Sequence, residues 1–126
     1  MRKARVQTAV VAALLVACAG VGTAAARRPA TQAERTAIVR ALPKIYRAGI
    51  AKAPAGCVTL VARVSANGRY AEVTPHFSSR AVCVRYASDG FFLLRRRARG
   101  WKTIYNGSDE PPCSLGVPRD LIACAR

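Results

Sequence analysis

Apolar residues in the segment 37–50 recur three and four positions apart, a spacing that predicts an amphipathic helix. Its apolar face consists of Ala37, Ile38, Ala41, Leu42, Ile45 and Ile50. Thr31 and Glu34 have the spacing of a capping box, so the helix should begin after Thr31. Pro43 has no amide proton and clashes with the preceding turn, so we expect a kink or a restart close to it.

From Cys57 the apolar period changes to two, which predicts a strand over 57–65. The dipeptide Asn67-Gly68 favours a two-residue hairpin turn in which both residues take positive φ. The register then follows from pairing Ala66 with Arg69. Further along this ladder, Val64 pairs with Ala71, Ala62 with Val73 and Arg63 with Glu72.

Three more strands are predicted, over 81–87, 91–97 and 101–106. Three-residue turns at 88–90 and 98–100 join them, because this turn length matches apolar residues on facing strands. The resulting pairs are Val84 with Leu94, Tyr86 with Phe92, and Leu94 with Ile104.

Together these elements predict a single α+β domain over 31–126, with an amino-terminal helix packed on a four- to five-stranded antiparallel meander. Asp120 lies near the start of a short carboxy-terminal helix, in which Leu121 and Ile122 pack inward. Cystatin-like and NTF2-like sheets are the nearest shapes by analogy. The 126 residues leave no room for a second enzymatic domain or for a barrel of eight βα units.

The amino terminus has the layout of an export signal, with three basic residues before an almost unbroken apolar stretch over 6–26. The basic residues are Arg2, Lys3 and Arg5. We expect cleavage after Ala26, followed by a flexible leader over 27–30. The alternative is lipidation of Cys18, since Leu15–Cys18 resembles a bacterial lipobox, and a retained membrane helix is the third interpretation.

Four cysteines remain outside the signal, and an even number in a short exported domain indicates two disulfides. The preferred pairing joins Cys57 to Cys83 and Cys113 to Cys124, although the spacing leaves two other pairings open. A four-thiolate zinc site would need closely spaced cysteine pairs, which this chain lacks. We therefore predict no metal site.

The charge is strongly unbalanced, with 21 Lys and Arg against 6 Asp and Glu. Removing the three basic residues of the signal lowers the net charge from +15 to +12. The predicted register gathers arginines and aromatics on one sheet face, a combination suited to anion recognition and stacking. The candidate ligand-binding residues are Arg85, Arg95, Arg97, Arg99, Trp101 and Tyr105. The favoured alternative is that segment 108–126 covers the aromatics of this face.

The tail carries a pattern of spaced aromatic, glycine, proline and cysteine residues. The pattern consists of Trp101, Gly107-Ser108, Cys113, Val117-Pro118, Leu121 and Cys124. It resembles a pattern shared by small uncharacterised exported proteins of actinobacteria. That resemblance implies export and disulfides, and it implies no activity, cofactor or catalytic residue.

Candidate catalytic groups are few. The single histidine is His76, which follows Pro75 and is expected to lie in a loop. The hydroxyls of Ser78 and Ser79 follow it, and Asp109 with Glu110 is the only acidic pair without a structural role. Adjacent carboxylates point apart in an extended loop, which disfavours joint action on one bond. We therefore predict no catalytic residues.

The expected function is that of an exported, cationic, non-enzymatic binding or interaction module in the cell envelope or outside the cell. The expected partners are anionic envelope polymers or other polyanions, bound weakly and without specificity. No cofactor is expected, and membrane attachment would occur only through a lipidated Cys18. The alternatives are a small secreted hydrolase using His76 and an exported inhibitor or structural protein.

Overall fold

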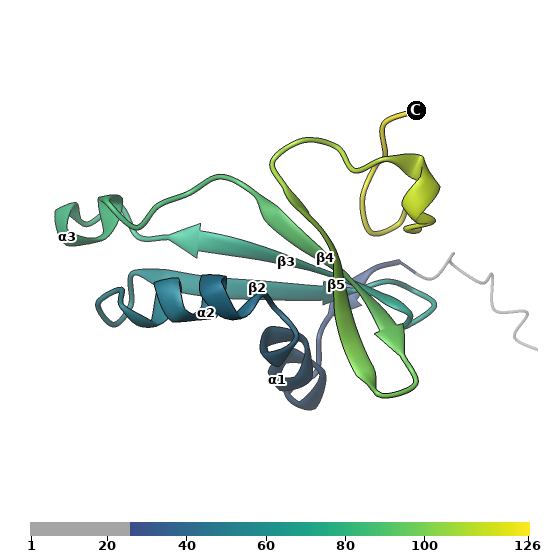
Figure 1. Ribbon diagram of the computed structural model, residues 1–126, viewed down its shortest axis with the longest axis horizontal. Helices are drawn as coiled ribbons and strands as arrows, with labels where there is room; N and C mark the ends of the chain where they lie inside the picture. The colour runs from purple at the N-terminus through teal and green to yellow at the C-terminus, as the bar shows by residue number, and fades with distance from the viewer. Residues whose placement is uncertain (1–25) are drawn as a thin grey trace, which may run out of the picture.

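Residues 26–126 are described by the computed structural model, which contains one five-stranded antiparallel sheet and several short helices (Figure 1). The strands are β1 (Arg28–Pro29), β2 (Val58–Val64), β3 (Tyr70–Phe77), β4 (Phe91–Arg97) and β5 (Gly100–Gly107). Their order in the sheet follows the chain. The helices are α1 (Gln32–Arg40), α2 (Lys44–Ala51), α3 (Ala81–Val84) and the 3-10 turn η1 (Cys113–Leu115). This is the predicted α+β class. Residues 1–25 of the predicted signal, with Cys18, lie outside the described residues.

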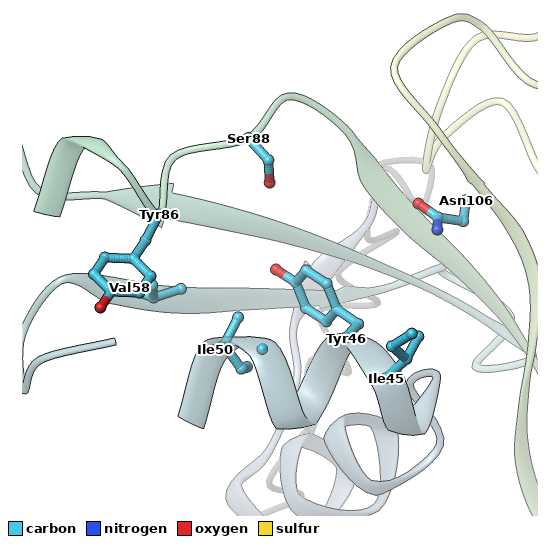
Figure 2. Close-up of a pocket in the computed structure, with 8 residues that line it drawn as sticks. Ile45, Tyr46, Ile50, Val58, Tyr86, Ser88 and Asn106 are labelled. Carbon is cyan, nitrogen blue, oxygen red and sulfur yellow. The ribbon is translucent and has the colours of Figure 1, made fainter. Parts of the chain in front are cut away.

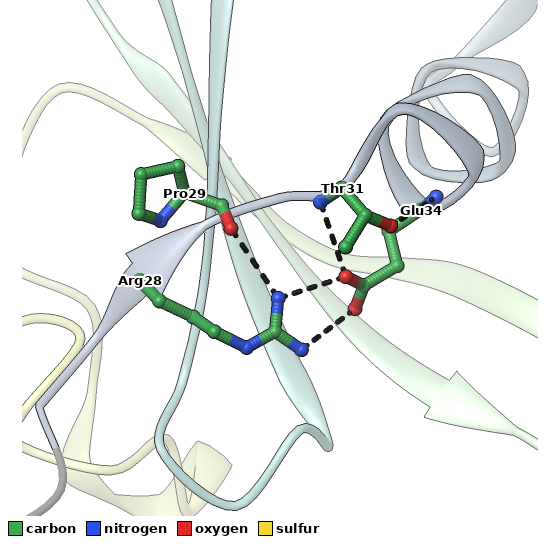
Figure 3. A network of polar contacts seen from close by, with 4 residues as sticks. All are labelled: Arg28, Pro29, Thr31 and Glu34. Atoms are coloured by element: carbon green, nitrogen blue, oxygen red, sulfur yellow. Dashed lines mark hydrogen bonds and ion pairs between the residues drawn. The ribbon is translucent and has the colours of Figure 1, made fainter.

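The start of α1 is fixed by the predicted capping box (Figure 3). The Thr31 hydroxyl accepts the Glu34 N–H at 3.2 Å, and the Glu34 carboxylate accepts the Thr31 N–H at 3.1 Å. The Arg28 guanidinium donates to both carboxylate oxygens, at 2.8 and 3.0 Å. This paired hydrogen bond and the contacts with Thr31 lower the pKa of Glu34 to about 2.

Residues 27–30 are not a flexible leader, so that prediction was wrong. Arg28 lies opposite Val64 in a short β1–β2 ladder. The Arg27 guanidinium donates to the Leu121 carbonyl at 3.0 Å. These partners are distant in sequence, and a local pattern of charged and small residues does not reveal them.

Pro43 separates α1 from α2, as its missing amide proton requires. Both helices pack on the same face of the sheet (Figure 1). The helix-side core contains Ile38, Leu42, Leu60, Ala62, Val64, Ala71, Val73, Phe92 and Leu94, all buried. Those that lie on strands occupy the predicted alternate positions of β2 and alternate positions of β3 and β4, whereas Ile38 and Leu42 come from the helical segment.

The β2–β3 register is confirmed, with Val64 opposite Ala71. The predicted turn type is wrong. It requires a positive φ at both Asn67 and Gly68, and of these two residues only Gly68 has one, of 70°. Four residues, 66–69, form the loop, and the Asn67 side-chain oxygen accepts the Arg69 N–H at 2.9 Å. That local hydrogen bond favours the longer turn while leaving the register unchanged.

The strand predicted over 81–87 does not form. Residues 81–84 make up α3, and the sheet partner of β4 is β3, with Val73 opposite Phe92. The predicted pairs of Val84 and Tyr86 with β4 are therefore absent. Val84 is 59% exposed, so the alternation of apolar residues in this segment does not mark the buried face of a strand.

Pro75 lies on β3 opposite Leu60, just beyond the last β3–β4 pair at Val73. Proline offers no N–H to a neighbouring strand, so it suits the point where the ladder to β4 ends. β3 continues beyond this point without pairing with β4, and the chain from α3 leads back to the start of β4 (Figure 1).

The β4–β5 hairpin has a two-residue turn at 98–99, with Arg97 opposite Gly100. Leu94 consequently faces Thr103 rather than the predicted Ile104. A bulge between Leu93 and Leu94 then restores the predicted register toward the far end of the hairpin.

The carboxy-terminal segment covers the other face of the sheet (Figure 1). Its buried residues Val117 and Leu121 form a second core with Tyr70 and Leu93. The predicted carboxy-terminal helix does not form. A single turn occurs instead, in which the Leu121 N–H donates to the Pro118 carbonyl at 3.1 Å. The Asp120 carboxylate accepts the Ala66 N–H at 2.9 Å rather than starting a helix.

Both predicted disulfides are confirmed, joining Cys57 to Cys83 and Cys113 to Cys124. The first connects the start of β2 to α3, and the second closes the carboxy-terminal segment on itself. None of the helices within 26–126 combines the length and apolarity needed to cross a membrane.

Replacing Glu34 with Gln should lower the free energy of unfolding by about 1 kcal/mol at pH 7, because the partly exposed pair with Arg28 is screened. The lowered pKa means that the ionised carboxylate stabilises the fold above about pH 4.5 and loses this effect as the pH falls toward 2. Urea unfolding at several pH values should show the two proteins converging in acid. A gap of equal size at pH 2 and pH 7 would contradict this prediction.

Replacing Cys113 and Cys124 with Ser should destabilise the protein by about 3 kcal/mol, since their disulfide closes a short loop in the unfolded chain. Urea unfolding monitored by tyrosine and tryptophan fluorescence would measure the loss. If unfolding is unchanged, packing of Leu121 alone holds the segment in place.

Candidate functional site

Six exposed basic residues gather around the β4–β5 turn and the adjacent start of β3. They are Arg69, Arg95, Arg96, Arg97, Arg99 and Lys102, and together we call them the cationic hairpin. Arg95 lies opposite both Tyr70 on β3 and Lys102 on β5. The Arg96 N–H donates to the Arg69 carbonyl at 2.8 Å, and this hydrogen bond holds the end of the β2–β3 turn beside β4. The backbone ladder thus fixes the spacing of these charges.

Two arginines of the cationic hairpin lie over aromatic rings. The Arg95 guanidinium carbon is 5.8 Å from the centre of the Tyr70 ring, and that of Arg96 is 6.0 Å from the Trp101 ring. These contacts hold the guanidinium groups by cation–π attraction while both residues stay exposed. Neither guanidinium donates a hydrogen bond to another residue within 26–126, so their N–H groups face solvent.

No acidic side chain in the described part of the chain forms an ion pair with the cationic hairpin. The ion pairs found within 26–126 join Arg27 to Glu72 and Arg28 to Glu34. The charge of the hairpin is therefore uncompensated inside the domain. Such a cluster attracts anions and repels other cations.

The structure brings together three of the predicted binding residues, Arg95, Arg97 and Arg99, and does not place Arg85 with them. Arg85 follows α3, which lies at the end of the sheet away from the β4–β5 turn (Figure 1). Its guanidinium lies over the Tyr86 ring at 5.0 Å. Arg85 was grouped with the other arginines because a strand was wrongly predicted over 81–87.

The bulge in the β4–β5 ladder separates the two predicted aromatic residues. Trp101 packs against the helix-side core, whereas Tyr105 packs against the core under the carboxy-terminal segment. Tyr105 lies 5.5 Å from the Phe91 ring and donates its hydroxyl hydrogen to the Asp109 carbonyl at 2.9 Å. Tyr105 is thus a structural residue, and Trp101 supports Arg96.

His76 lies on β3 opposite Thr59, not in a loop as predicted from Pro75. Its side chain is exposed and makes no hydrogen bond or ion pair with the residues that the structure describes. The nearby Ser78 hydroxyl accepts the Arg80 N–H at 3.3 Å. Across residues 26–126, no group of three or more His, Cys, Asp or Glu side chains could hold a metal ion.

A groove that the sequence pattern does not reveal lies between α2 and the chain that joins α3 to β4 (Figure 2). We call it the Tyr46 groove. It has a volume of about 410 Å³ and is lined by Ile45, Tyr46, Gly49, Ile50, Val58, Tyr86, Ser88 and Asn106. An adjoining cavity of about 230 Å³ shares Tyr46, Ser88 and Asn106. Pro75, which lies just beyond the β3–β4 ladder, also lines this second cavity.

The Tyr46 hydroxyl is buried and has no hydrogen-bond partner within the described chain. The Tyr46 ring packs on Phe92 with its centre 4.5 Å away, and burial raises the pKa of the hydroxyl. The group therefore stays protonated near neutral pH and is a hydrogen-bond donor. Ile45 continues the apolar helix pattern, which predicts burial, but it is 86% exposed beside this groove.

Comparison with known proteins finds no matching family model, no matching curated protein and no matching solved structure.

Proposed function

We propose that the protein is an exported, non-enzymatic binding domain that holds anionic polymers of the cell envelope or extracellular space through its cationic hairpin. The observation that carries this proposal is the gathering of six exposed basic residues with no acidic partner among residues 26–126. Neighbouring strands lie about 4.8 Å apart, so these like charges repel one another across the ladder. A bound polyanion would relieve that repulsion.

An extended polymer suits this surface better than a small anion. The basic residues follow a two-strand ribbon and its turn, and they do not line either cavity at Tyr46. A ribbon of this kind can contact several charges of one chain at once. Binding of this type depends on released counterions, so it is weak at physiological salt and indifferent to sequence.

Export is part of the proposal. The two disulfides are typical of proteins in oxidising compartments, and the basic-then-apolar amino terminus is typical of an export signal. The resemblance to small exported actinobacterial proteins points the same way. Cleavage after Ala26 gives a free domain, whereas lipidation of Cys18 would tether it to a membrane.

The fold analogy is a separate part of the proposal. An antiparallel meander with two helices packed on one face supports the analogy with cystatin-like and NTF2-like shapes.

Replacing Arg95 and Arg97 with Gln should weaken binding to a fluorescently labelled oligothymidylate, used as a generic polyanion, by about tenfold in low salt. The physical reason is the loss of two counterion-releasing contacts. Fluorescence anisotropy at several salt concentrations would measure both the affinity and its salt dependence.

The matched control replaces Arg40 and Arg85 with Gln, which removes the same charge from two exposed positions outside the hairpin. We expect this variant to bind within about twofold of the natural protein, since only the diffuse field changes. Equal losses in the two variants would show that net charge, and not the cationic hairpin, determines binding.

A further inference from the structure

The Tyr46 groove is chemically unlike the rest of this molecule. None of its eight lining residues is Lys, Arg, Asp or Glu, in a chain that carries 21 basic residues. An acidic residue, Asp89, lines the adjoining cavity instead. A groove without charges on a cationic protein does not favour the anions that the cationic hairpin would attract.

Most of the lining is apolar or aromatic. Ile50 and Val58 form part of the floor, and Tyr86 faces them from the chain after α3 (Figure 2). Ile45 stands at the rim with 86% of its surface exposed. A ligand with a flat apolar body would remove this surface from water, which is the main favourable term in binding of small molecules.

Polar groups meet around the Tyr46 hydroxyl. Ser88 lies across the groove from it, and Asn106 closes one end (Figure 2). The hydroxyl is buried without a partner among the described residues, and such groups are unfavourable until they gain a hydrogen bond. A ligand acceptor atom placed here would supply that missing bond.

From these features we infer that the Tyr46 groove binds a small uncharged aromatic molecule that presents a carbonyl-type acceptor to the Tyr46 hydroxyl. The volume of about 410 Å³ falls within the range of about 300–1,000 Å³ seen for small-molecule sites. This site is separate from the cationic hairpin and does not depend on the function proposed above.

Gly49 offers a way to close the groove without disturbing the fold. It is a helical residue of α2, and a Cβ atom added there would meet nothing within 4 Å. A larger side chain at this position would extend into the open space of the groove. Replacing a helical glycine also favours the helix, so the variant should fold at least as well as the natural protein.

The test uses prodan, an uncharged naphthalene with a ketone acceptor whose emission shifts to shorter wavelength in apolar sites. Titration of the purified protein, with both disulfides formed, should give saturable binding. Gly49→Leu should weaken it by more than about tenfold with an equal or higher melting temperature. Tyr46→Phe, which keeps the ring on Phe92, should weaken it about fivefold through loss of one hydrogen bond.

Three controls test whether prodan occupies the Tyr46 groove and not another surface of the protein. Gly49→Ala adds little volume and should bind prodan within about twofold of the natural protein. The Arg95→Gln, Arg97→Gln variant should bind prodan normally, and added salt should leave the affinity unchanged because the groove has no charge. Absence of saturable binding, or equal binding by Gly49→Leu and the natural protein, would overturn the inference. Unchanged prodan affinity in Tyr46→Phe would contradict the inferred hydrogen bond from the Tyr46 hydroxyl to the ketone oxygen of the ligand.

Discussion

The alternation of side chains along β4 is the constraint on which the rest of the domain depends. Phe92 and Leu94 point to the helices, Leu93 points to the carboxy-terminal segment, and all three are at most 3% exposed. A strand buried on both faces needs a layer on each side. The amino-terminal helices form one layer, and the segment closed by the disulfide of Cys113 forms the other. A three-layer arrangement in about 100 residues follows from this one strand.

The same strand changes character at its exposed end, where the buried residues give way to arginines. The bulge at Leu93/Leu94 lets the apolar half of β4 keep one register with β5 and the basic half another. The Trp101 side chain therefore packs against the helix-side core, and the Arg96 guanidinium lies over its ring. The local irregularity separates a part of the hairpin that stabilises the fold from a part that faces solvent.

Much of the fold could be predicted because its signals are local. The capping box at Thr31, the helix break at Pro43 and the β2–β3 register each depend on residues that are near one another in sequence. The strand predicted over 81–87 failed because alternating valines also fit one exposed helical turn anchored by Cys83. Arg85 was assigned to the wrong end of the sheet for that reason. The Tyr46 groove could not be predicted, since it arises where four segments, α2, β2, the chain after α3 and β5, leave space between them.

The disulfide between Cys57 and Cys83 has a consequence for where the groove can exist. α3 packs few side chains into the cores, and Cys83 is its one buried residue. The covalent bond from Cys83 to the start of β2 therefore sets how far the chain bearing Tyr86 and Ser88 stands from α2. In a reducing compartment that wall would lose its covalent link to β2, and the width of the groove would no longer be fixed by a bond. Under the proposed export and the inferred ligand binding, capture is coupled to oxidation: a molecule made inside the cell would meet a formed groove only after it, too, had reached an oxidising compartment.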